Sequence, residues 1–130
     1  MPTYDNPNVI RHQFPSHDFG AGAFAGSLKG PAGHKGRILD LGLSNITETF
    51  TNVTTGAYLR VGTGADPDAY AQMDCAAAAA TDTYNTQDDT DAIIDEDLPA
   101  DTQIEVTGVA PTGGTPAGIA SFYVDVAWFK

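Results

Sequence analysis

Apolar and polar residues alternate with a period of two along much of the chain, which is the pattern of half-buried β-strands. In the segment RILDLGLS, Leu39, Leu41 and Leu43 share one predicted face. The segment AYLRVGT repeats the pattern with Leu59 and Val61. We therefore expect strands, and not helices, to form the body of the protein.

The last third of the chain carries the clearest alternation. In TQIEVTGVA, Ile104 and Val106 share a face. The segment IASFYVDVAWFK places its apolar residues on one face of a longer strand: Ala120, Phe122, Val124, Val126 and Trp128. Between these segments, PTGGTPAG consists of turn-forming residues, so we expect the two strands to form a hairpin.

Two segments in the middle are less regular. NITETFTNVTT is rich in threonine but places Glu48 on the same face as Ile46 and Phe50, which favours an edge strand. In ADPDAYAQMDCAAAAATD, the alanines and Asp68 as a candidate N-cap favour a helix, whereas the alternation up to Cys75 favours a strand. We expect a strand that runs through Cys75 and a loop after it.

The beginning of the chain shows neither period. Residues 1–18 contain three prolines, and the glycine-rich residues 19–36 include one short predicted strand that carries Phe24 and Leu28. This pattern predicts an extended N-terminal arm over residues 1–18 and a single domain over residues 19–130.

Seven or eight short strands, separated by turn signals about every ten residues, predict an all-β protein. The expected architecture is an antiparallel β-sandwich. Periodicity does not specify the order of the strands, so jelly-roll and immunoglobulin-like arrangements both remain open.

The chain carries a formal net charge of −11, and its charges are distributed unevenly. Residues 1–37 contain four Lys/Arg and two acidic residues, whereas residues 38–130 contain two Lys/Arg and fifteen acidic residues. An acidic body of this kind repels phosphate backbones, so nucleic acid is not an expected partner. No apolar run of about 18 residues occurs, so no membrane span is predicted.

No group of residues forms a recognisable catalytic or cofactor motif. Cys75 is the single cysteine, and the three histidines lack the spacing with a glutamate that marks a helical zinc site. VGTGADP has Pro67 where a dinucleotide-binding loop has its third glycine. We therefore predict a protein that is not an enzyme and has no cofactor and no metal site.

The acidic run DDTDAIIDED, from Asp88 to Asp97, admits two interpretations. Its carboxylates are of the kind that binds Ca²⁺, but the spacing of a calcium loop is absent and Ile93–Ile94 interrupts the run. A solvated acidic surface is the favoured interpretation, and cation binding stays open.

The positively charged N-terminal region is the predicted docking surface. An arm that becomes ordered on binding can cover a large area of a partner, with Arg and Lys forming charge-assisted contacts and phenylalanines acting as apolar anchors. The predicted docking residues are Arg11, His12, Phe14, His17, Phe19, Phe24, Lys29, Lys35 and Arg37. Small homo-oligomers are expected to form through sandwich edges, such as the threonine-rich strand.

Three segments carry a resemblance to a known class of protein: GPAGHKGRILDLGLSNITETF, YLRVGTGADPDAYAQMD and DLPADTQIEVTGVAPTGGTPAGIASFYVDVAWF. They resemble capsid decoration (cement) proteins of tailed bacteriophages, over residues 19–130 and without a signature motif. The resemblance implies a virion component that binds the outside of the major capsid protein shell, often as a trimer at junctions between capsomers. It brings no catalytic residues.

A second interpretation is a carbohydrate- or calcium-binding β-sandwich module. Tyr58, Tyr70, Tyr84 and Trp128 would stack on sugar rings, while aspartates accept hydrogen bonds from sugar hydroxyls.

Overall fold

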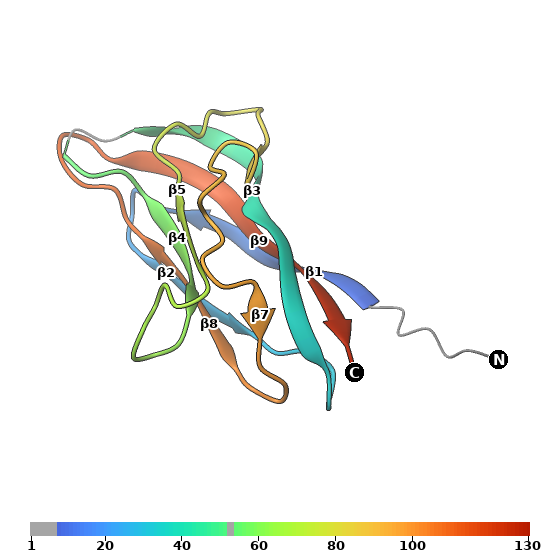
Figure 1. Cartoon of the computed structure of the whole chain (residues 1–130). Coiled ribbons are helices and arrows are strands. Elements are labelled where there is room, and N and C mark those ends of the chain that lie inside the picture. Colours follow the sequence, from blue (N-terminus) through green and yellow to red (C-terminus); the bar gives the residue numbers. More distant parts are fainter. Residues whose placement is uncertain (1–7, 52–53) are drawn as a thin grey trace.

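The computed structural model describes residues 8–51 and 54–130, and these residues form an all-β protein (Figure 1). Two antiparallel sheets pack face to face, which confirms the predicted β-sandwich. Among the described residues, no helix that could cross a membrane is found. The strands are β1 (Asn8–Asp18), β2 (Phe24–Leu28), β3 (Lys35–Thr51), β4 (Tyr58–Gly62), β5 (Ala71–Asp74), β6 (Tyr84–Asn85), β7 (Asp97–Leu98), β8 (Ile104–Val109) and β9 (Ala117–Phe129).

The strands follow a nested pairing of the two halves of the chain. Sheet A has the order β1-β9-β3-β6, with β7 also paired to β3, and sheet B has the order β2-β8-β4-β5. Thus β1 pairs with β9, β2 with β8, β3 with β6 and β7, and β4 with β5. This nesting is the jelly-roll arrangement. An immunoglobulin-like sandwich would instead place its first two strands in one sheet.

The core lies between the sheets and is formed by the inward faces of their long strands. In β8, buried and partly exposed residues alternate, and Ile104 and Val106 face the core as predicted. Burial of one such side chain contributes about 1.5–3 kcal/mol. The largest fully buried side chains are Trp128, Phe19, Phe122, Leu41, Leu43, Leu59, Met73, Leu98, Ile104, Val61, Val106 and Val124.

The predicted hairpin between β8 and β9 is wrong. β8 pairs with β2 and β4 in sheet B, whereas β9 pairs with β1 and β3 in sheet A. The loop that joins them therefore crosses from one sheet to the other. Both strands bury one face against the opposite sheet, so their alternation is the same as that of two paired strands.

β3 joins two segments that the sequence pattern separates. A bulge after Ile38 shifts the register of β3 against β9. As a result Ile38 is buried and Leu39 is 47% exposed. Leu41 and Leu43 lie on the inner face as predicted, but the prediction that Leu39 shares this face is wrong.

Residues 45–51 of the threonine-rich segment form the second half of β3, and they are not an exposed edge strand. Residues 52–53 lie outside the described part. On one side this half of β3 pairs with β9. On the other side Thr81 N donates to Ile46 O (3.0 Å), and Phe50 N donates to Ala78 O (2.9 Å). The loop that follows β5 thus covers this edge.

The ambiguous alanine-rich segment forms a strand, as predicted. β5 places Ala71 and Met73 in the core, and Cys75 directly after it is also buried. Cys75 N donates to Ala57 O (2.9 Å), so the extended course continues to that residue. Burial raises the pKa of the Cys75 thiol, which keeps it protonated.

The acidic segment between β6 and β8 closes one lateral side of the sandwich. Ile94 N donates to Tyr70 O (2.9 Å) beside β5, the edge strand of sheet B. Ile38 N in sheet A donates to Glu96 O (2.8 Å). Residues 92–98 therefore form a strap that links the two sheets on the side away from β1.

Residues 8–18 form the strand β1, which pairs antiparallel with β9 and places Asn8 opposite Trp128. The prediction of an arm outside the domain over residues 1–18 is therefore wrong for residues 8–18, and residues 1–7 lie outside the described part. Residues 8–18 are extended, as predicted for the arm, but they lie along sheet A of the same molecule.

The inward face of β1 explains why the strand is hard to recognise in the sequence. His12 and His17 lie opposite Val124 and Ala120, which are core residues of β9. The period is also interrupted by a bulge around Pro15. Two inward histidines and one shifted register hide the alternation that marks the other strands.

One end of the sandwich is organised around the buried ring of Trp128. We call it the Trp128 end: Asn8 pairs with Trp128 there, and Gly30 and Gly36 lie directly against its indole ring. A Cβ atom added at Gly36 would lie 2.7 Å from Trp128 Cζ3, and one at Gly30 would collide with the same ring. Both glycines leave the space that the indole fills.

We predict that Gly36→Ala lowers the free energy of unfolding by about 1–3 kcal/mol, because the added methyl group overpacks the site of Trp128. Gly64→Ala is the matched control, since nothing lies within 4 Å of a Cβ at Gly64. We expect the control to change stability by at most about 0.5 kcal/mol in urea unfolding. Equal effects of the two substitutions would contradict this packing.

Candidate functional site

The nine predicted docking residues lie along β1 and around the Trp128 end. The structure does not gather them on one side of the molecule, because Arg37 lies near the strap, on the side away from β1. Most of the nine residues have contacts within the protein. Arg11, His12, Phe14 and His17 belong to β1, Phe19 follows it, Phe24 begins β2, Lys29 follows β2, and Lys35 and Arg37 belong to β3.

The three phenylalanines pack inside the protein and do not form an exposed docking surface. Phe19 is fully buried, Phe24 is 8% exposed, and Phe14 packs against the core. The Phe14 and Phe24 rings meet edge to face with centroids 5.3 Å apart, and Phe19 lies 5.3 Å from Phe50. These rings fill the side of the sandwich at which β1 turns into β2. The prediction that they anchor a partner is wrong for Phe19 and Phe24, which are buried in the core. Phe14, within β1, is partly exposed.

His17 belongs to the same aromatic cluster. Its ring lies 4.8 Å from the Phe19 ring, and its Nε2 atom is 2.9 Å from Gly22 O. This hydrogen bond ties β1 to the turn that leads into β2.

Arg11 links β1 to the neighbouring strand β9 on the outer face of sheet A. Its Nε and Nη2 donate to the two carboxylate oxygens of Asp125 at 2.8 and 2.9 Å, and its guanidinium lies 4.0 Å above the Tyr123 ring. Tyr123 Oη in turn donates to Asp40 Oδ2 (3.1 Å). Burial and the nearby Asp40 carboxylate raise the pKa of Tyr123, so the phenol remains a donor. The network therefore links β1, β9 and β3 across one face.

His12 forms a directional hydrogen bond with Trp128. Trp128 Nε1 lies 3.0 Å from His12 Nε2, and the rings meet edge to face at 5.8 Å. Because an indole can only donate, Nε2 must be unprotonated and the imidazole is neutral. Burial lowers the pKa of His12, while the negative charge of Asp125 opposes that shift. The neutral ring is thus part of the folded structure.

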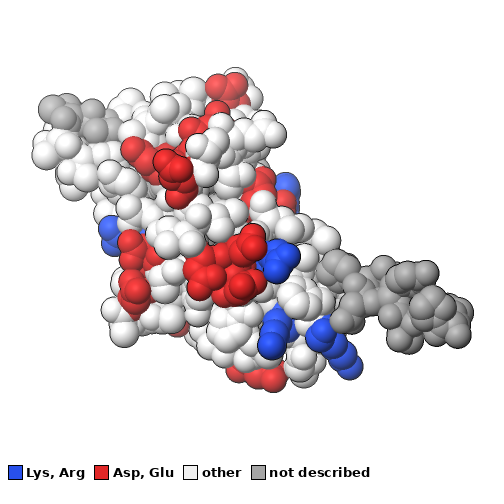
Figure 2. Space-filling view, viewed as in Figure 1, with Lys and Arg blue, Asp and Glu red and all other residues white. Residues whose placement is uncertain are grey.

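The lysines at the Trp128 end differ from Arg11 in having no acidic partner. Lys29 and Lys35 are adjacent to Gly30 and Gly36, and Lys130 follows the end of β9. No carboxylate within the described residues pairs with these three lysines. Figure 2 shows Asp and Glu side chains over the middle, top and bottom of the visible face, and most of the visible Lys and Arg side chains toward its right and lower right.

Arg37 lies near two exposed carboxylates, with N–O distances of 3.6 Å to Glu96 and 3.7 Å to Asp97. These long contacts between exposed groups add little to stability. They do direct the Arg37 charge toward the strap and away from β1.

Exposed apolar residues near β1 form a feature that the sequence analysis did not identify. Val9 is 60% exposed and Ile10 37% exposed, and Leu39 on β3 is also exposed. Val9 and Ile10 precede the interrupted part of β1, where the sequence shows no period. A strand assignment for β1 would have been needed to identify them.

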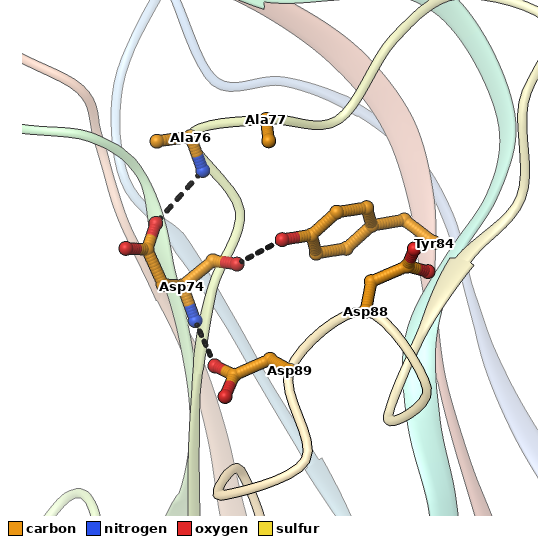
Figure 3. Close-up of a pocket in the computed structure, with 6 residues that line it drawn as sticks. All are labelled: Asp74, Ala76, Ala77, Tyr84, Asp88 and Asp89. Carbon is orange, nitrogen blue, oxygen red and sulfur yellow. Dashed lines mark hydrogen bonds between the residues drawn. The ribbon is translucent and has the colours of Figure 1, made fainter.

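An open pocket of about 280 Å³ lies at the end of β5, beside β6 (Figure 3). Tyr84 Oη donates to Asp74 O (2.8 Å), and Asp89 Oδ2 accepts from Asp74 N (3.0 Å). Burial raises the pKa of Tyr84 to about 12, so its hydroxyl stays protonated. The pocket is lined by Asp74, Ala76, Ala77, Tyr84, Asp88 and Asp89.

The acidic run uses its carboxylates to cap local turns. Asp88 Oδ2 accepts from Asn85 N (3.0 Å), and Asp95 Oδ1 accepts from Asp97 N (3.1 Å). Within residues 8–51 and 54–130, no group of three or more His, Cys, Asp or Glu side chains is arranged to hold a metal ion.

Comparisons with models of protein families, with curated proteins and with solved structures found no match.

We predict that acidification weakens the fold through His12. Its pKa in the folded protein is lowered, so the folded state binds fewer protons than the unfolded state. The contribution is complete above the unfolded pKa of about 6.5 and is lost as the pH falls through the folded pKa. The difference in unfolding free energy between neutral and mildly acidic pH should shrink in His12→Gln, which keeps an acceptor that does not titrate. His34→Gln is the control, and an unchanged difference in His12→Gln would contradict the assignment.

We also predict that Arg11 and Asp125 are energetically coupled. In a double-mutant cycle of Arg11→Met and Asp125→Asn, we expect a coupling energy of about 0.5–1 kcal/mol, because the pair is bidentate but the Arg11 side chain is half exposed. The matched pair Arg37→Met and Asp97→Asn should give a coupling near zero. Comparable couplings in the two cycles, measured by urea unfolding, would show that Arg11 does not hold β1.

Proposed function

We propose that this protein is a non-enzymatic structural component of a virion. It binds the outside of the major capsid protein lattice of a tailed phage and stabilises that shell, with a trimer as the favoured oligomer. The resemblance over residues 19–130 motivates the class of partner.

The observation that supports the proposal best is that the titratable side chains of β1 and its neighbours bond to other groups of the same protein. The Arg11, Tyr123 and Asp40 network holds strands together, and His12 is bound to Trp128. These groups stabilise a rigid body. What remains available is a surface that combines unpaired lysines with exposed apolar residues along a sheet edge. Such a surface suits binding to another protein.

The fold itself does not select the function. Jelly rolls occur in viral shell proteins and in lectins, so the architecture is compatible with both interpretations. The acidic body is compatible with an exterior position, where it meets solvent and not packaged phosphate backbones.

The alternative is a carbohydrate- or calcium-binding module, and the pocket beside Tyr84 is its structural support. The carboxylates of Asp88 and Asp89 can accept hydrogen bonds from hydroxyl groups. Trp128 cannot stack on a sugar, since it is 1% exposed. Calorimetry with a glycan panel and with Ca²⁺ tests this alternative, and it is abandoned if neither releases or absorbs heat.

The proposal is tested with shells assembled from the major capsid protein encoded in the same genome, in the absence of this protein. We expect the protein to cosediment with these shells at a saturable ratio and to raise their unfolding temperature, since a ligand that binds the assembled state stabilises it. Shells already saturated with the protein are the control. Failure to cosediment with the unsaturated shells would end the proposal, and ultracentrifugation of the free protein tests the trimer.

A further inference from the structure

β1 leaves one side of sheet A unpaired. It is the terminal strand of that sheet, and within the described residues no strand pairs with its outer side. The opposite side of the sandwich is closed by the strap of residues 92–98. The outward-directed backbone N–H and C=O groups of β1 are therefore available to another strand.

The first part of this edge lacks the usual protection of edge strands. The bulge and Pro15 interrupt pairing only after Gln13. Between Asn8 and Gln13 the charged side chain is Arg11, and its guanidinium is directed across the sheet to Asp125 and Tyr123. The free edge is thus flanked by the exposed side chains of Val9 and Ile10 rather than by a protective charge.

Unpaired lysines lie at the end of the sandwich where β1 begins. Lys29, Lys35 and Lys130 lie at the Trp128 end, where β1 begins, and no described carboxylate pairs with them. The acidic strap lies across β3, on the far side of sheet A from β1. Asp101 also lies at this end, where its Oδ1 accepts from Gly33 N (2.9 Å). A segment that lies along the start of β1 would meet Lys130 first, because Lys130 follows the β9 residues that pair with the start of β1. Lys35 on β3 and Lys29 after β2 lie farther across the same end.

We propose that an extended, acidic segment of a partner protein adds to sheet A along the outer edge of β1, between Asn8 and Gln13. Backbone hydrogen bonds supply the affinity, Val9 and Ile10 supply apolar contact, and the lysines select acidic side chains. This inference rests on the proposed function for the identity of the partner, and it names the surface and the chemistry of the segment that binds.

A second copy of the chain is a poorer occupant of the same edge. Pairing β1 with β1 of another copy would join two bodies that each carry a net charge of −11. An acidic segment encounters the lysines without that repulsion. The two occupants are separated by experiment.

The experiment uses NMR amide shifts of the labelled protein, titrated with a short synthetic peptide of alternating valine and glutamate. We expect shifts in residues 8–13, with binding weakened about tenfold by Val9→Asp, as for a central interface residue. Ile94→Asp is the matched control, because Ile94 is as exposed as Val9, at 60%, but lies on the strap. Lys35→Glu tests the charge without altering β1, and a valine–lysine peptide should bind at least about tenfold more weakly.

The outcomes separate this inference from the proposed function. Peptide shifts outside β1, or no shifts, overturn the inference. Concentration-dependent shifts in β1 without peptide show that a second copy pairs there, which also overturns it. A second experiment measures amide hydrogen exchange in the protein bound to shells. If the protein binds but residues 8–13 are not protected, the inference that a segment pairs with β1 is wrong, while the proposed function is retained. Peptide pairing at β1 without any shell binding supports the edge and ends the proposed function.

Discussion

The packing of Trp128 joins the first strand, β1, to the last strand, β9. Its indole ring fills space left by Gly30 and Gly36, and its Nε1 donates to His12. A strand from the beginning of the chain and the last strand are thereby joined at one end of the sandwich. The nested pairing of the jelly roll brings these distant segments together, and the Trp128 contacts set their register.

The concentration of positive charge at the beginning of the chain has a partly internal explanation. Arg11 binds Asp125 and stacks on Tyr123, and Arg37 lies near carboxylates of the strap. These cations therefore neutralise acids of the same molecule. The three lysines at the Trp128 end have no acidic partner among the described residues, so positive charge is concentrated at this end of an acidic protein.

Periodicity predicted the strands that bury one regular face. The alternation of β8 placed Ile104 and Val106 on one face, that of β9 placed Val126 on one face, and all three are buried. Strand order could not be predicted, because a residue that faces the core is compatible with either sheet. The bulge at Leu39 could not be predicted either, since the shifted register leaves the local composition unchanged.

The candidate site was predicted only in part. Lys29 and Lys35 were among the predicted docking residues and lie at the Trp128 end, whereas Lys130 was not predicted. Phe19 and Phe24 were expected outside and are core residues. A phenylalanine in an irregular, glycine-rich stretch carries no signal of the direction in which it points. Val9 and Ile10 were missed because inward-facing histidines in β1 concealed the strand.

Residue-resolved amide exchange of the isolated protein at low concentration tests most directly whether β1 is a strand of this sandwich with one open side. The account predicts alternation over residues 8–13: amides bonded to β9 exchange slowly, and those directed to the free edge exchange fast. Uniformly fast exchange would show that this segment is not held on the sheet. Uniformly slow exchange would show that the edge is already covered.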